Sequence, residues 1–284
     1  MINERININD TAYFDTYLLK NSKEYNVDKK RPLVIVCPGG GYGFTSDREA
    51  EPIALKFNSV GLHSVVLWYT TQDLHPNIPE HAIVELAKTI KSVREHAEEW
   101  YVDPDKIIVC GFSAGGHLAA NMSVHWHDKW LADLAEATNE EIKVNCSILG
   151  YPATSLGKMT PNTEAFASRI IDKPQTHNLR FFGTEDPSDE QIVRANTVNY
   201  ISKNTPPSFI WHTFEDVLVD VSHSVEFARK MAEIKVPFEL HIFEKGEHGL
   251  ALCDRTTARK ASHHNSHVIK WFDLCMEWLV PYID

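Results

Sequence analysis

The hydrophobic residues of this chain follow two patterns, short runs that suit strands and stripes at helical spacing. Apolar runs bounded by turn residues predict strands, most of them buried on both faces of a sheet. These runs lie at 5–8, 12–19, the start of 31–43, 63–70, 106–110, 144–153, 208–214 and 238–243. Amphipathic stripes predict helices at 46–60, 80–100, from about 114, 221–234 and 265–280.

Two of these helices differ in how clearly the sequence defines them. The stripe in 80–100 is unbroken and consists of Ile83, Leu86, Ala87, Ile90, Val93 and Ala97. The sequence allows two starting points for the helix predicted at 46–60. Ser46 and Glu49 have the spacing of a capping box, whereas Pro52 would mark the first helical turn.

The alternation of strands and helices predicts an α/β fold. We expect a mostly parallel central sheet of about eight strands with helices on both faces. No internal repeat or low-complexity linker divides the sequence, so residues 1–284 are expected to form a single domain. Residues 155–205 are polar and without clear periodicity, and we expect them to form an irregular, cap-like insertion after the sixth strand.

Charge and composition narrow the classes of partner. The net charge is −11 and no basic cluster stands out, which argues against nucleic acid. No apolar stretch is long enough to span a membrane, and MINERININD lacks the apolar segment of a secretory signal, so a cytoplasmic location is expected. Scattered cysteines without a C-x-x-C pair indicate reduced core residues and no zinc site: Cys37, Cys110, Cys146, Cys253 and Cys275.

Ser113 is the candidate nucleophile because Gly111-Phe112-Ser113-Ala114-Gly115 fits the G-x-S-x-G pattern. A serine at a tight strand-to-helix turn has a strained backbone, and large residues two positions before or after it would clash. The pattern alone is common by chance. Here it also follows a predicted strand and begins a predicted helix, where free N–H groups stabilise negative charge.

The glycine-rich stretch CPGGGYG, residues 37–43, follows the third predicted strand. Ester hydrolysis passes through an oxyanion that needs fixed N–H donors, and we predict that Gly40, Gly41 and Ala114 supply them. A phosphate-binding loop is a second interpretation, but no Lys-Ser/Thr follows and G-x-G-x-x-G is incomplete. A simple tight turn is the third, although such a turn does not need three glycines.

His248 is the candidate general base among 15 histidines. It follows the predicted strand at 238–243 and a turn, which places it at the sheet edge where the nucleophile is expected. The other histidines occupy structural or surface positions in the predicted fold. Among them, His117 lies inside the nucleophile helix and His241 lies in the middle of a strand.

The carboxylate that orients His248 should follow the preceding strand, at 208–214. Three acidic residues are available there. Asp220 precedes a helix and is typical of an N-cap, which leaves Asp216 as the preferred residue and Glu215 as the alternative. The chain order Ser113, Asp216, His248 is that of the α/β-hydrolases.

Four stretches together resemble α/β-hydrolases of the esterase group related to hormone-sensitive lipase, and more narrowly bacterial acetyl xylan esterase and feruloyl-esterase-like proteins. They are PGGGYGFTSDREAEPIALKF, DPDKIIVCGFSAGGHLAA, PPSFIWHTFEDVLV and PFELHIFEKGEHGL. Pro38 stands where the loop of the wider group usually begins with histidine, and the acetyl-esterase-like subgroup shares this proline. The resemblance implies an α/β-hydrolase fold, the triad Ser113, Asp216 and His248, and the donors Gly40, Gly41 and Ala114.

The expected activity is hydrolysis of short acyl esters, with an acetylated sugar or xylo-oligosaccharide as the leading substrate and no metal or organic cofactor. An amidase or formamidase and a feruloyl esterase of the same fold remain alternatives, and a catalytically inactive binding module is a remote one. A prolyl-oligopeptidase would need a large amino-terminal domain. A lipase would be expected to have an apolar lid, whereas 155–205 is polar. The resemblance fades in that segment, where substrate contacts are expected.

Overall fold

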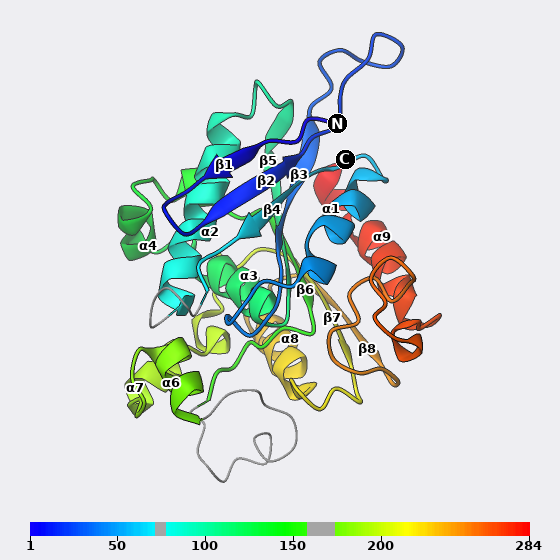
Figure 1. The fold of residues 1–284 in the computed structure, drawn as a ribbon. Helices are drawn as coiled ribbons and strands as arrows, with labels where there is room; N and C mark the ends of the chain where they lie inside the picture. The colour runs from blue at the N-terminus through cyan, green and yellow to red at the C-terminus, as the bar shows by residue number, and fades with distance from the viewer. Residues whose placement is uncertain (72–77, 158–173) are drawn as a thin grey trace.

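The computed structural model describes residues 1–71, 78–157 and 174–284 (Figure 1). Within these residues one eight-stranded sheet has the order β1-β2-β4-β3-β5-β6-β7-β8. Its strands are Arg5–Asn7 (β1), Tyr13–Tyr17 (β2), Arg31–Cys37 (β3), His63–Trp68 (β4), Val102–Phe112 (β5), Cys146–Gly150 (β6), Ser208–Thr213 (β7) and Phe238–Phe243 (β8). β2 pairs antiparallel with β1 and β4, and all other pairs are parallel, as predicted.

Helices cover both faces of this sheet, with α2, α3 and α8 on one side and α1 and α9 on the other (Figure 1). The short helices α6 and α7 lie together at the lower end of the view. The helices are Glu51–Asn58 (α1), Ile78–Glu95 (α2), Ala114–His125 (α3), Lys129–Leu134 (α4), Pro174–Phe182 (α6), Asp189–Arg194 (α7), Ser222–Ile234 (α8) and Trp271–Ile283 (α9).

The central strand β3 shows why its sequence is almost wholly apolar. Successive side chains of a strand point to opposite faces. Leu33 and Ile35 join the core beneath α2 and α3, whereas Val34 and Val36 join the core beneath α1 and α9. All four side chains are fully buried. The continuous apolar run therefore follows from burial on both faces of a parallel sheet.

The segment predicted as a helix at 46–60 begins later than its first possible start. A 3₁₀ turn at Asp47–Glu49 precedes α1, and Pro52 lies in the first turn of α1. The side chain of Ser46 accepts no capping hydrogen bond, and Glu49 is buried with other partners. Of the two helix starts that the sequence allows, the one marked by Pro52 is correct.

The insertion at 155–205 is more regular than predicted in the part that the structure describes. Residues 174–200 contain α6, α7 and the 3₁₀ helix Thr197–Tyr200 (η3), so the expectation of an irregular segment is wrong there. A capping box starts α7, since the Ser188 side chain accepts from Gln191 N at 3.3 Å and Gln191 Oε1 accepts from Ser188 N at 3.0 Å. Residues 158–173 lie outside the described part.

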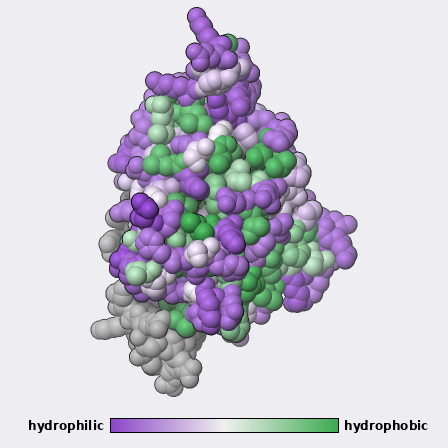
Figure 2. Space-filling model, turned by 90° about the vertical axis from the view of Figure 1, so that its right-hand side faces the viewer, coloured by the Kyte–Doolittle hydropathy of each residue, from purple (hydrophilic) through white to green (hydrophobic). Residues whose placement is uncertain are grey.

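None of the helices in the described ranges is both long and apolar enough to cross a membrane. The face that carries α1 and α9 shows groups of hydrophobic residues among hydrophilic ones (Figure 2). All five cysteines are free and buried, as expected for reduced core residues.

Candidate active site

Ser113 occupies a sharp turn between the end of β5 and the start of α3. Its backbone has φ 54° and ψ −116°, a conformation that non-glycine residues rarely adopt. A Cβ on Gly111 would lie 2.0 Å from Gly115 O, and a Cβ on Gly115 would lie 2.0 Å from Cys37 O. Only glycine fits at both positions, which is the steric reason for the G-x-S-x-G spacing.

The structure brings Ser113, His248 and Asp216 into one chain of hydrogen bonds. Ser113 Oγ lies 2.8 Å from His248 Nε2, and His248 Nδ1 lies 2.6 Å from Asp216 Oδ2. A carboxylate only accepts, so Nδ1 donates to Asp216 and Nε2 is left to accept from the serine hydroxyl. Glu215, the alternative carboxylate, instead pairs with Lys245 at 2.7 Å.

The Asp216 carboxylate is buried and held by further donors. Its Oδ1 accepts from Leu218 N at 2.9 Å and Val219 N at 3.0 Å. Burial acts to raise the pKa of this carboxyl, but hydrogen bonds from His212 and His248 outweigh it and hold the pKa below its ordinary value. Asp216 therefore stays ionised, which is what a group that orients an imidazole needs.

His212 is a second histidine that contacts Asp216, and no sequence pattern predicts this contact. Its Nε2 lies 3.2 Å from Asp216 Oδ2 and 3.0 Å from Val219 O. Both partners only accept, so Nε2 carries the proton and Nδ1 accepts from Ser224 Oγ at 2.7 Å. His212 thus holds the same carboxylate oxygen that accepts from His248.

The glycine loop lies directly against the nucleophile. A Cβ on Gly39 would lie 3.0 Å from Ser113 Cβ. Within the described residues, the amides of Gly40 and Gly41 donate to no protein acceptor. Ala114 is the first residue of α3, where an N–H has no partner within its own helix. The three predicted donors therefore meet one requirement of the predicted role, which is an N–H without a protein acceptor in the described residues.

A buried carboxylate, Glu49, ties this loop to the loop that carries His248. Its Oε2 accepts from Gly39 N at 2.9 Å, and its Oε1 accepts from the Tyr151 hydroxyl at 2.6 Å. The same hydroxyl accepts from Ala251 N at 3.0 Å, while the Tyr151 ring packs edge-on against His248 at 5.0 Å. Burial, with the nearby Glu49 charge, raises the pKa of Tyr151, which stays a neutral donor.

Helix α6 covers the outer side of the glycine loop. Arg180 Nη1 donates to Gly41 O at 3.1 Å, and a Cβ on Gly43 would lie 3.3 Å from the Arg180 guanidinium carbon. The Gly41 carbonyl is thereby held, which fixes the peptide that follows it. Arg180 lies in the segment predicted as irregular, so no sequence pattern pointed to it.

The imidazoles of His117 and His241, two histidines set aside as structural, have partners other than the Ser113 side chain. His117 is buried and hydrogen-bonded to Tyr42 and Ala195 O, and His241 on β8 contacts Glu239. No group of three or more His, Cys, Asp or Glu in the described part of the chain has the arrangement to hold a metal ion.

Solved structures similar to this chain include esterases. The carboxylesterase Cest-2923 from Lactobacillus plantarum WCFS1 has a TM-score of 0.85 and 26% identity, covering 100% of this chain and 99% of its own. An acetyl ester-xyloside bifunctional hydrolase from Caldicellulosiruptor lactoaceticus has a TM-score of 0.77 and 31% identity, covering 96% and 89%. The fold defines this protein as an α/β-hydrolase, and both of these similar structures are ester hydrolases of that fold.

The family is defined by sequence as well. Residues 15–231 match the family model described as BD-FAE, and the chain belongs to this family. A curated relative, Endo-1,4-beta-xylanase B of Butyrivibrio fibrisolvens, is 31% identical over 232 residues, which cover 81% of this chain and 34% of the relative. The chain spans a third to a half of the length of the first curated relatives it matches.

Proposed function

We propose that this protein hydrolyses short acyl esters, with acetyl esters of xylose-based oligosaccharides as the leading substrates, and that Ser113, His248 and Asp216 carry the reaction. The observation that carries the proposal is His248, which lies 2.8 Å from Ser113 Oγ and 2.6 Å from Asp216 Oδ2. The sugar part rests on the names of similar proteins, among them a xylanase and an acetyl ester-xyloside hydrolase.

In the proposed reaction, His248 Nε2 takes the proton from Ser113 Oγ as that oxygen attacks the ester carbonyl carbon. The carbonyl oxygen becomes an oxyanion, and the amides of Gly40, Gly41 and Ala114 donate to it. His248 then gives its proton to the leaving alcohol oxygen as the C–O bond breaks. Water then attacks the acyl-serine carbonyl carbon while His248 Nε2 takes a proton from it. As the bond from that carbon to Ser113 Oγ breaks, His248 gives the proton to Oγ, which releases the acid and restores Ser113.

The first test is hydrolysis of p-nitrophenyl esters by the purified protein. We expect acetate to react much faster than butyrate or longer esters, and Ser113→Ala to lower kcat/KM by about 10⁴-fold or more. Activity that survives this substitution contradicts the role of Ser113. A preference for longer acyl chains contradicts the acetyl assignment.

The second test uses natural ester classes. Acetate release from a panel of acetylated xylo-oligosaccharides and other sugars is compared with hydrolysis of a feruloyl ester and a formyl amide. We expect the acetylated saccharides to give the highest kcat/KM. A higher value for the amide or the feruloyl ester would replace the proposed substrate while leaving the proposed chemistry of Ser113 in place.

A further inference from the structure

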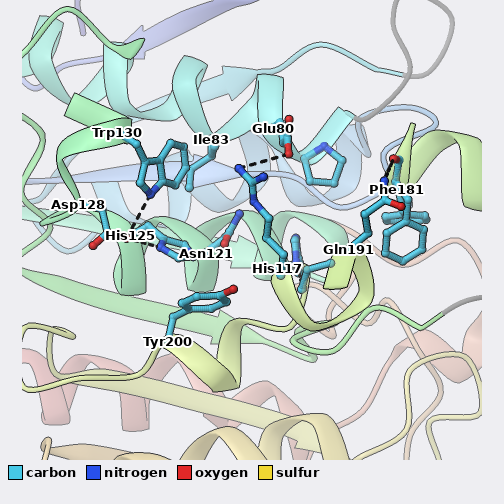
Figure 3. Close-up of a pocket in the computed structure, with 14 residues that line it drawn as sticks. Glu80, Ile83, His117, Asn121, His125, Asp128, Trp130, Phe181, Gln191 and Tyr200 are labelled. Atoms are coloured by element: carbon cyan, nitrogen blue, oxygen red, sulfur yellow. Dashed lines mark hydrogen bonds and ion pairs between the residues drawn. The ribbon is translucent and has the colours of Figure 1, made fainter. Parts of the chain in front are cut away.

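A cavity of about 370 Å³ lies beside α3, starting one helical turn beyond Ser113 (Figure 3). His117, Asn121 and His125 line it from α3, and their four-residue spacing places them on one face of that helix. The remaining walls come from α2, from α6, α7 and η3 of the insertion, and from the start of α4. Ser113 and His248 are not among its lining residues.

The side chains of His117 and Phe181 lie between this cavity and the glycine loop. His117 Nδ1 accepts from the Tyr42 hydroxyl at 2.8 Å, and His117 Nε2 donates to Ala195 O at 3.1 Å. Tyr42 belongs to the glycine loop, and its ring packs edge-on against Phe181 at 5.6 Å. The cavity is thus distinct from the candidate active site but shares His117 and Phe181 as its boundary.

Two polar side chains of the cavity have no protein partner in the described ranges. They are the amide of Asn121 on α3 and the hydroxyl of Tyr200 on η3. Figure 3 shows Asn121 between His125 and His117, with Tyr200 on the opposite side from Glu80 and Ile83. Polar groups that face a hollow without a partner bind water or a ligand. An amide and a hydroxyl both donate and accept, which suits alcohol groups.

Aromatic rings are fixed beside these polar groups. His125 packs edge-on against Trp130 at 5.6 Å and lies 4.5 Å from the Tyr200 ring. Asp128 Oδ2 accepts from His125 Nδ1 at 2.7 Å and from Trp130 Nε1 at 3.3 Å, so both rings are held in place. Trp130 remains 37% exposed and offers a flat apolar surface.

Each charged side chain that lines the cavity already has a protein partner. Arg194 lies 3.6 Å from Glu80 at the exposed side, and Asp128 is hydrogen-bonded to His125. A charged ligand would find no unpaired partner among these groups. Fixed aromatic faces together with donors and acceptors instead suit a ring that has apolar C–H faces and hydroxyl edges.

We propose that this cavity binds an uncharged saccharide, and that it is a second sugar-binding site beside the catalytic one. The choice of xylose units rests on the proposed function, whereas the saccharide class rests on the side chains of the cavity. Its volume of about 370 Å³ corresponds to on the order of a dozen water molecules, enough for a mono- or disaccharide.

The test is calorimetric titration of the intact protein with unacetylated xylobiose and xylotriose, which cannot be turned over as esters. We expect weak binding that Trp130→Ala and Asn121→Ala each reduce about tenfold. Tyr25→Ala removes another exposed aromatic, 60% exposed in the 22–26 turn, and is the matched control that should leave binding unchanged. Binding should also persist after Ser113 is blocked with a phosphonate ester.

Three results would overturn the proposal: no saccharide binding, binding that both cavity substitutions leave intact, or binding that the phosphonate abolishes. Acetate release by the wild-type protein is measured in parallel and decides the proposed function separately. Saccharide binding without acetate release would support the cavity site and contradict the esterase proposal. Acetate release without saccharide binding would do the opposite.

Discussion

At the candidate active site Ser113, His248 and Asp216 are hydrogen-bonded in series, whereas in the cavity one helical turn farther along α3 two polar side chains have no protein partner in the described residues. His248 contacts both Ser113 and Asp216, and Glu49 contacts both Gly39 and Tyr151. Asn121 and Tyr200 in the cavity lack such contacts in the described residues. Both regions lie along α3, and they differ in whether their polar side chains have protein hydrogen-bond partners.

This difference corresponds to two tasks, the preorganisation of catalytic groups and the recognition of a ligand. Groups that must act in a transition state gain from being held before the substrate arrives, because no reorganisation is then needed. Groups that recognise a ligand must exchange water for ligand atoms, so their hydrogen bonds are left free. Substitutions at the candidate active site should therefore change kcat, and substitutions around the cavity should change binding or local stability.

Among substitutions that keep the Ser113 hydroxyl, the largest effect is expected from Asp216→Asn. The amide would turn an N–H toward His248 Nδ1, which favours the tautomer with the proton on Nε2, and that nitrogen could no longer accept from Ser113. We expect kcat/KM for p-nitrophenyl acetate to fall by about 10⁴-fold. Glu215→Gln, one residue away and paired with Lys245, is the matched control.

The Asp216→Asn comparison has a clear contrary outcome. A loss of less than tenfold, in a variant whose circular dichroism matches the wild type, would mean that His248 does not depend on this carboxylate. An equal loss of kcat/KM in Glu215→Gln would mean that the reaction depends on negative charge near the loop after β7. It would not depend on the contact between Asp216 and His248.

A smaller effect is expected from Glu49→Gln. The amide keeps one acceptor, so either Gly39 N–H or the Tyr151 hydroxyl loses its present acceptor. We expect kcat for p-nitrophenyl acetate to fall about tenfold or more with little change in KM, because a shifted glycine loop weakens oxyanion binding in the transition state. Asp47→Asn, exposed and two residues away, is the control.

A rise in KM at constant kcat for Glu49→Gln would contradict this role. It would indicate that Glu49 supports substrate binding in general and not the position of the oxyanion donors.

The fold could be predicted from the sequence because its signals are local. Parallel strands buried on both faces give continuous apolar runs, and the predicted mostly parallel sheet is confirmed. The candidate residues Ser113, Asp216 and His248 follow strand ends, and parallel strands bring those ends to one edge. Their contacts in the structure are those that the predicted roles require, and the roles themselves stay a prediction.

What the sequence did not reveal depends on tertiary contacts. Glu49, Tyr151 and His212 have ordinary local surroundings, and only packing brings them to the glycine loop, His248 and Asp216. Helices α6 and α7 are short and flanked by polar residues, which hides their periodicity. The Ser188–Gln191 capping box is the one local signal for α7 in its sequence.

His117, which lies between the two regions, should make the free energy of unfolding depend on pH. Burial lowers the pKa of His117 to about 4, whereas an unfolded histidine titrates near 6.5. The folded value is the lower one, so this stability contribution is complete above about pH 6.5 and is lost as pH falls toward 4. The loss attributable to His117 is on the order of 3 kcal/mol.

We expect His117→Asn to be less stable at pH 7 and to lose less stability than the wild type between pH 7 and pH 4. Urea unfolding at several pH values measures both quantities. His264→Asn, at an exposed position, should keep the wild-type pH dependence. Parallel pH curves for wild type and His117→Asn would show that the buried imidazole does not resist protonation.

The smallest effect is expected from Ser188→Ala, which removes the capping hydrogen bond of α7. Loss of an N-cap costs about 1 kcal/mol, and here it falls on a helix that supplies Gln191 and Arg194 to the cavity. We expect α7 amides to exchange with solvent about fivefold faster, with p-nitrophenyl acetate hydrolysis unchanged. Ser59→Ala, at the end of α1, should leave α7 exchange as it is. A fall in esterase activity together with faster α7 exchange would mean that the cavity and the candidate active site are coupled through His117. The two regions would then not differ in function as argued above.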